Sequence, residues 1–173
     1  GAVARLKKQL EIIKTLSAGR NSVREREKAI LMNMCMLSDR RGNVLVLDRK
    51  DPIWGGITFP GSHVEPGESF VDSVIREMRE ETGFTVYHPV LCGMKQWMED
   101  AQTRAVVLFY KADVFDGELS SSEEGKVFWM RLDEMKKSRL APGMDYMLRV
   151  FLEDSLSEVY LHSEHGVWEN TLK

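Results

Sequence analysis

The stretch from residue 61 to residue 84, GSHVEPGESFVDSVIREMREETGF, constrains the fold of this chain more than any other. Pro66-Gly67 is a turn pair. Ser69, followed three residues later by Asp72, is typical of a capped helix start. Gly83 stands where a helix ends in a left-handed residue. We therefore expect a turn followed by a helix that runs between these two end signals.

The expected helix has an apolar side. Its members recur with the spacing of one helical face: Val71, Val74, Ile75, Met78 and Thr82. We expect this side to pack against the core of the domain.

Three glutamates share another face of the same helix. Glu77, Glu80 and Glu81 are spaced at i, i+3 and i+4, so they point the same way and repel one another. A hard divalent cation with oxygen ligands, Mg²⁺ or Mn²⁺, would offset this repulsion, so we predict that the three bind metal. Arg76 precedes Glu80 by four residues and can orient it. Glu68 lies in the turn before the helix and can reach the same place.

At these residues the chain resembles the Nudix hydrolases, the MutT-like family. The family's box is a glycine, five residues, a glutamate, seven residues, and then R-E-hydrophobic-x-E-E-x-G-hydrophobic. Here Glu68 is followed by seven residues and then by residues 76–84, REMREETGF, a full match. The departure is Ser62, which stands where the box has its first glycine, with Gly61 before it. Because serine resists positive φ, this replacement leaves the local turn geometry open.

An acidic surface helix is the ordinary alternative, but it does not require the turn, the cap, the arginine and the stop at these spacings. The resemblance is strong over residues 57–84, continues more loosely to about residue 154 and does not cover the first 29 residues. It implies an α/β fold, the Nudix-type α-β-α sandwich with a mixed β-sheet, over residues 30–173.

Residues 1–29 differ from the rest in charge. They hold eight Lys or Arg and three Glu, a net charge of +5, while the whole chain carries −3, so the remainder sums to −8. Leu6, Leu10 and Ile13 fall on one side of a helix expected from Ala4 to Leu16, and a break is expected over residues 18–22. We predict a basic amphipathic helical extension over residues 1–29, with an accessory helix favoured over a partner or homodimer surface.

Composition excludes several classes of protein. A chain of 173 residues with 43% hydrophobic residues fits one domain with a sizeable core. The net charge and a pI near 5.9 argue against binding to a nucleic acid polymer. We find no membrane-spanning run and no secretory signal, and Cys35 and Cys92 form no metal-binding pair. A reduced, cytoplasmic location is therefore expected.

Other elements are expected around the box. The strands predicted are 30–37 and 44–48, joined by a hairpin turn at 39–43, then 57–60, 85–97 with a kink at Pro89, 104–114, 126–130 and a late one at 159–161. Helices are predicted over 133–138 and 144–153. These mixed strands and helices predict an α/β sandwich.

A polar loop, residues 120–125, precedes one of these strands. Hydrolysis needs a group that orients or deprotonates water, and MutT-like enzymes often have a glutamate followed by glycine in the corresponding loop. Glu124-Gly125 resembles that pattern. We name Glu124 as a catalytic base or metal ligand, with Glu68 as the competing base and an acidic loop without a role as the ordinary alternative.

Asp145 follows Pro142-Gly143 at the start of the expected last helix. In purine-sanitising members of the family an Asp or Asn at this place bonds the base, and a helix cap is the alternative role. Trp54, Trp97 and Trp129 can stack a base, although such residues more often belong to the core.

The resemblance therefore implies a Mg²⁺-dependent Nudix pyrophosphohydrolase that binds a nucleotide. The implied catalytic residues are Glu68, Arg76, Glu80 and Glu124, the metal ligands Glu77, Glu80, Glu81 and Glu124, and the substrate-binding residue Asp145. Nucleoside triphosphates of the 8-oxo-dGTP kind are the favoured substrate class. Alternatives are ADP-ribose, a nucleotide sugar or a dinucleoside polyphosphate as substrate, a catalytically silent nucleotide-binding module, and a scaffold that binds a protein through its first helix.

Overall fold

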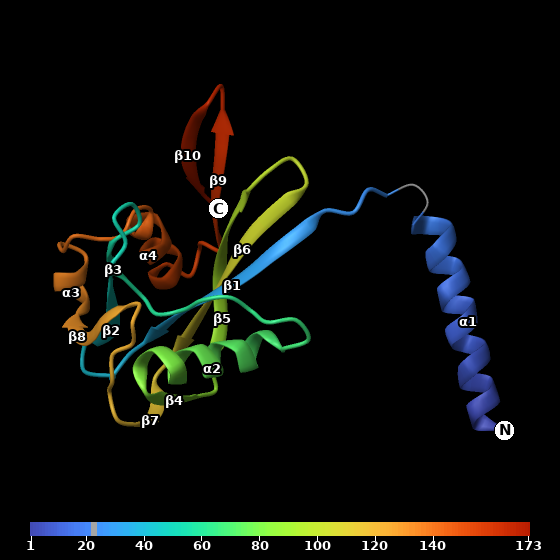
Figure 1. Cartoon of the computed structure of the whole chain (residues 1–173), viewed down its shortest axis with the longest axis horizontal. Coiled ribbons are helices and arrows are strands. Elements are labelled where there is room, and N and C mark those ends of the chain that lie inside the picture. Colours follow the sequence, from blue (N-terminus) through green and yellow to red (C-terminus); the bar gives the residue numbers. More distant parts are fainter. Residues whose placement is uncertain (22–23) are drawn as a thin grey trace.

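A computed structural model of the chain describes residues 1–21 and 24–173 (Figure 1). The helices are α1 Ala2–Asn21, α2 Phe70–Thr82, α3 Leu132–Met135 and α4 Met144–Leu152. The strands are β1 Lys28–Leu37, β2 Asn43–Arg49, β3 Gly56–Thr58, β4 Phe84–Tyr87, β5 Val90–Met98, β6 Thr103–Ala112, β7 Val114–Gly117, β8 Gly125–Arg131, β9 Glu158–Glu164 and β10 Val167–Leu172.

The strands form three sheets. The largest is mixed and has the order β1-β6-β5-β9-β10, in which β1 pairs with β6 and β5 pairs with β9 in parallel. A second sheet has the order β3-β2-β8, and a third joins β4 to β7. This arrangement of mixed sheets and helices confirms the expected α/β fold.

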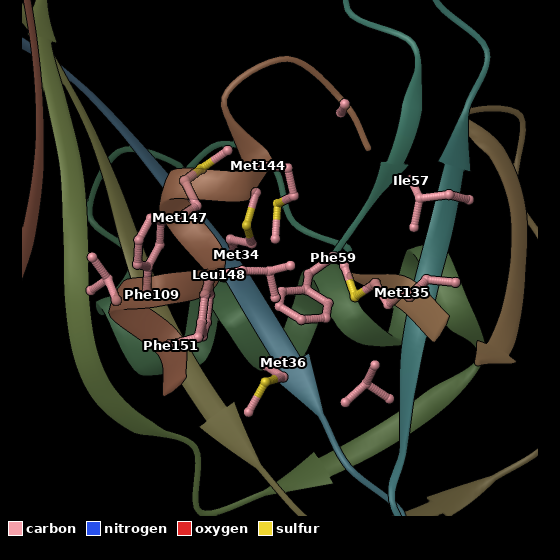
Figure 2. Packing of buried hydrophobic residues seen from close by; sticks show 14 of the residues in the cluster. Met34, Met36, Ile57, Phe59, Phe109, Met135, Met144, Met147, Leu148 and Phe151 are labelled. Atoms are coloured by element: carbon pink, nitrogen blue, oxygen red, sulfur yellow. The ribbon is translucent and has the colours of Figure 1, made fainter. Parts of the chain in front are cut away.

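Helices α2 and α4 cover opposite faces of the large sheet. Met34 and Met36 of β1 join a buried cluster with α4, and Figure 2 shows them near Phe109 and Phe151. The residues that alternate with them on β1, such as Cys35, join a second cluster with Val74 and Met78 of α2. Because successive side chains of a strand point to opposite faces, the second half of β1, residues 33–37, is buried on both sides, in agreement with its mostly apolar sequence.

The predicted hairpin between the first two strands is wrong, although its turn exists. Asp39 Oδ1 accepts hydrogen bonds from Arg41 N at 2.7 Å and Asn43 N at 3.1 Å. However, β2 pairs with β3 and β8, and among the described residues its link to the end of β1 is an isolated bridge between Val44 and Ser38, the residue that follows β1. The chain therefore changes sheet at this turn, because both strands are apolar on both faces and either can leave the hairpin for another partner.

Two long predicted strands are each divided in the structure. The strand expected over 85–97 becomes β4 and β5, separated at His88 (φ 52°) and Pro89, and the two parts lie in different sheets. The strand expected over 104–114 becomes β6 and β7. The late strand is present as β9, and β10, which was not predicted, pairs with it in a hairpin.

Helix α1 is longer than the segment expected from Ala4 to Leu16 and continues to Asn21. The break expected over residues 18–22 is therefore wrong up to Asn21, and Ser22 lies outside the described residues. Its apolar side chains are exposed, as for Leu6 at 59% and Ile13 at 62%. None of the described helices is long and apolar enough to cross a membrane.

Candidate active site

Helix α2 begins and ends as its sequence predicts. Ser69 is the N-cap residue, and its Oγ accepts a hydrogen bond from Asp72 N at 3.0 Å. Gly83 adopts φ 79° and its N–H donates to Arg79 O at 3.0 Å. These caps satisfy backbone groups that the helix leaves unpaired at its ends, and so fix its length.

The buried side of α2 is rotated relative to the predicted apolar face. Met78 and Thr82 are fully buried as expected, whereas Val71 is 40% exposed. Glu77 and Glu81 lie on the buried side, at 8% and 3% exposure. The carboxylates are therefore partly enclosed and do not form an open acidic face.

The loop before α2 lies along β1. Asn33 N donates to Ser62 O at 2.7 Å and Cys35 N donates to Pro60 O at 2.9 Å. Gly61 cannot carry a side chain here, because a Cβ would lie 2.1 Å from Asn33 O. Ser62 is not among the residues with positive φ, so serine fits without backbone strain in place of the first glycine of the box.

Asn33 links this loop to α2, and the sequence reasoning missed it. The Asn33 side chain is buried, and its Nδ2 donates to Ser73 Oγ at 2.9 Å while its Oδ1 accepts from Ser62 N at 3.2 Å. The sequence signal that could have identified this residue is an asparagine in the middle of an apolar strand. A buried amide is costly unless it is hydrogen-bonded, so Asn33 fixes the distance between the loop and the helix.

Arg76 is the centre of the charged network. It bonds both oxygens of Glu68, with Nε at 2.7 Å and Nη2 at 2.9 Å, in a bidentate pair. Its Nη1 donates to Glu77 at 2.6 Å and to Glu80 at 3.2 Å. Nη2 also donates to His63 O at 3.1 Å. The predicted pairing with Glu80 is present, and the bond to Glu68 also ties the preceding turn to the helix.

Glu81 is the most enclosed carboxylate. Its Oε2 accepts from Gly61 N at 2.9 Å, whereas its Oε1 is buried and has no hydrogen-bond partner among the described residues. Burial, reinforced by the nearby charge of Glu124, raises the pKa of Glu81 to about 8. Burial also raises the pKa of Glu77, against the opposing effect of Arg76. The loop residue Glu124 therefore lies close enough to act on both glutamates of the helix.

These residues fit a divalent cation. Glu77, Glu80 and Glu81 each keep one oxygen that accepts no hydrogen bond from the part of the chain described here. Within that part, no three His, Cys, Asp or Glu side chains already surround a common point. Arg76 holds one oxygen each of Glu77 and Glu80, and the Glu80 side chain is 59% exposed and free to turn. An oxygen-rich set with an orphaned buried carboxylate oxygen suits a hard cation.

Asp145 lies at the start of α4, away from these carboxylates. The N-cap residue of α4 is Gly143, and no side chain forms a cap hydrogen bond there. Asp145 borders a hollow of about 500 Å³ together with Leu140, Leu148 and other residues of α4 and the segment before it. No residue of the box lines that hollow, and α4 packs on the face of the large sheet opposite α2.

The three tryptophans named from the sequence differ in their surroundings. Trp129 packs against Phe84 and Phe115, with ring centroids 6.0 and 5.4 Å away, and so belongs to the core. Trp54 is 57% exposed in the loop after β2. Trp97 is partly buried against the cluster on the α4 side of the large sheet. Trp97 belongs to β5 of the large sheet, and its ring centre lies 5.7 Å from Lys95 Nζ.

The arrangement of box, helix and sheet agrees with known proteins. Residues 32–151, well over half of the chain, match the family model described as NUDIX domain. The chain belongs to the Nudix family. Members of this family generally use divalent metal cations, in agreement with the carboxylates of α2.

Particular Nudix proteins are similar to this chain. YvcI, a Nudix hydrolase of Bacillus subtilis, is 35% identical over 115 residues, which are 61% of this chain and 72% of that protein. The ADP-ribose pyrophosphatase of Methanocaldococcus jannaschii is 30% identical over 90 residues, 51% of this chain and 53% of that one. The crystal structure of the MutT protein from Bacillus halodurans has a TM-score of 0.68 and 28% identity, and the match covers 83% of this chain and 97% of that one.

Proposed function

We propose that this Nudix hydrolase is a Mg²⁺- or Mn²⁺-dependent pyrophosphohydrolase of purine nucleoside triphosphates, oxidised guanine nucleotides among them. The products are a nucleoside monophosphate and pyrophosphate. The observation that carries this proposal is the buried Glu81, whose Oε1 has no donor among the described residues and which lies beside Glu77 and Glu124. A carboxylate in this position is stabilised when a cation binds to it.

Each residue of the cluster has a proposed role. Glu77, Glu80, Glu81 and Glu124 hold the metal, which when bound supplies positive charge for the phosphate oxygens and acidifies water. Arg76 is a positioning residue, because the described geometry turns its guanidinium toward Glu68, Glu77 and Glu80.

Between the two proposed bases, the contacts favour Glu124. Both oxygens of Glu68 accept bonds from Arg76, and those bonds hold the pKa of Glu68 below its usual range. A carboxylate bound in this way accepts a proton poorly, because protonation would break the pair. Glu124 lies on an exposed loop and faces Glu77 and Glu81. We assign to Glu68 the task of holding Arg76, and to Glu124 the contact with water.

Glu123 supplies a matched control for the assignment of Glu124 as the base. Both Glu123 and Glu124 are exposed in the same turn. Glu124→Gln should lower kcat by about a hundredfold, the usual contribution of a general base, whereas Glu123→Gln should leave it unchanged. Equal losses in the two variants would show that the loop contributes only its overall charge.

Asp145 supports the choice of purine substrates. Its exposed carboxylate is not used as a cap bond for α4, so it is free to accept from the N–H groups of a base. Asp145→Ala should raise KM for the preferred purine and flatten the ranking among bases, with kcat on a poor substrate nearly unchanged. A variant that keeps the wild-type ranking would remove Asp145 from the substrate site.

A second substrate class is ADP-ribose, favoured by the similarity to the Methanocaldococcus jannaschii enzyme. A panel of purine and pyrimidine triphosphates, ADP-ribose, nucleotide sugars and dinucleoside polyphosphates separates the candidates when product release is measured with Mg²⁺ and with excess EDTA. Hydrolysis of ADP-ribose without that of triphosphates would replace the proposed substrate. Binding without hydrolysis of any compound would indicate a nucleotide-binding module.

A further inference from the structure

Lys95 is a buried cation that the proposed chemistry does not use. It lies in the middle of β5 and is only 8% exposed. In the part of the chain that the structure describes, its ammonium group donates no hydrogen bond to a protein acceptor, and Asp145 is the charged group that influences it most. Burial lowers the pKa of Lys95, and Asp145 only partly opposes that shift. Lysines are almost never this buried without a partner.

The surroundings make the position of Lys95 more unusual. Gly143 leaves room for it, since a Cβ on that residue would lie 2.8 Å from Lys95 Nζ. Nζ lies 5.7 Å from the centre of the Trp97 ring. The group also lies near the beginning of α4, where the helix dipole is positive and disfavours a second positive charge. An electron-rich ligand at this place would satisfy both the ammonium group and the helix end.

Strand pairing connects this place to the box. Met32, Val107 and Lys95 are direct partners on β1, β6 and β5, so they lie in one row on the same face of the sheet. Val107 belongs to the buried cluster with α4, which places Lys95 on the α4 side. Met32 also pairs with His63, whose carbonyl accepts from Arg76. The backbone of Lys95 is thus two strand spacings, about 10 Å, from β1, the strand along which the loop before α2 lies.

We infer that Lys95 and Asp145 together recognise a 6-oxopurine, with Lys95 donating to the C6 oxygen and Asp145 accepting from the N1–H edge. This inference rests on the proposed function and specifies its substrate class. The ammonium of lysine bonds readily to the adjacent O6 and N7 acceptors of guanine. Adenine instead has an amino group at C6, whose hydrogens would face the ammonium group. The partly buried Trp97 ring lies beside the same place and can cover the base.

A metal-free binding experiment tests the pair without turnover. Inosine and adenosine monophosphate differ at C6 and N1, so they probe the proposed contact directly. We expect calorimetric titration of the full chain in EDTA to give about tenfold tighter binding of inosine monophosphate. Lys95→Met should bring the two dissociation constants together by weakening the inosine nucleotide. Equal binding of the two nucleotides to the wild type, or an unchanged ratio in the variant, would overturn the inference.

Lys126 supplies the matched control. Its Nζ also lies 5.7 Å from an aromatic ring, that of Phe128, but the side chain is exposed on β8. Lys126→Met should leave the ratio of the two dissociation constants unchanged. Lys95→Met should melt no lower than the wild type, because it removes a buried charge that donates no hydrogen bond within the described residues and replaces it with an apolar side chain. This melting curve shows whether a loss of selectivity comes from the contact or from unfolding.

A second arm uses turnover. In the wild type, kcat/KM for GTP should exceed that for ATP by about tenfold, and Lys95→Met should bring the ratio near one through KM. An unchanged ratio overturns the inference while the proposed hydrolase activity stands. If no triphosphate is hydrolysed but inosine monophosphate still binds more tightly in a Lys95-dependent way, the proposed function fails and the recognition stands.

Discussion

Helices α2 and α1 both carry many charged residues, but they differ in how those residues are used. The 13 residues of α2 are capped by Ser69 and Gly83, and its side chains form buried contacts and the Arg76 network. The 20 residues of α1 include no acidic residue in the first turn, and Val3 and Leu16 remain 68% and 66% exposed. Length therefore does not indicate which helix the fold depends on. Capping and burial do, because tertiary packing supplies most of the stability of a helix.

The largest difference between the two helices should appear in catalysis. Glu80→Gln and Glu81→Gln in α2 should each lower kcat/KM by about a hundredfold or more, the upper range for losses at a metal site. Glu11→Gln in α1 is the control with the same chemical change, and it should have no effect. Hydrolysis is measured with Mg²⁺ and after chelation, and full activity in excess EDTA would contradict the metal role of α2.

Glu81→Gln should also change the stability of the metal-free protein, in a direction opposite to its effect on activity. The pKa of Glu81 is raised to about 8 by burial, so its contribution to stability is complete below the unfolded pKa and is lost as pH rises through 8. Each unit of raised pKa corresponds to about 1.4 kcal/mol. At pH 8 and above, Glu81→Gln should therefore unfold at a higher urea concentration than the wild type, by a free energy of up to a few kcal/mol.

At pH 4 the advantage of Glu81→Gln should largely disappear, because the wild-type carboxyl is then neutral in both states. Urea denaturation in EDTA at the two pH values measures the effect. The same advantage at both pH values would mean that the carboxylate is not the source of the instability.

A smaller effect is expected at the caps. Ser69→Ala removes the acceptor for Asp72 N and should cost about 1 kcal/mol of unfolding free energy. In α1, Ser17 Oγ donates to Lys14 O at an exposed position, so Ser17→Ala should change stability by less than about 0.5 kcal/mol. Urea denaturation of both variants measures this difference, and equal costs would remove capping as a distinction between the helices.

The smallest effect is expected from removing α1. Deletion of residues 1–24 retains the pair between Glu27 and Arg104, at 2.9 Å, and all of β1. We expect kcat/KM to stay within about twofold of the full chain, as for changes away from buried contacts. A truncated protein that is folded by circular dichroism but has lost turnover would place α1 in the catalytic unit and end the contrast with α2.

Local signals made several elements predictable. The cap at Ser69, the stop at Gly83 and the helical spacing between them act over a few residues, so the sequence alone identified α2. The same holds for α4, where Met147, Val150 and Phe151 are buried as expected from their spacing. The box spacing also identified the glutamates that the structure gathers around Arg76.

Strand partners were not predictable in this way. A strand that is apolar on both faces gives no sign of which neighbour it pairs with, so the parallel pairing of β1 with β6 came only from the structure. The change of sheet at His88, between β4 and β5, also depends on strand partners and came only from the structure.

The carboxylates of α2 and the surroundings of Lys95 also differ in how far the sequence predicted them. By itself the sequence determined the carboxylate helix, because regular spacing along one helix fixes which side chains are neighbours. Only the tertiary structure decided that Gly61 must approach Asn33, that Glu81 is buried with an orphaned oxygen, and that Lys95 faces the start of α4. These contacts join residues far apart in the chain, and their energies depend on burial, which the packing of the whole domain sets.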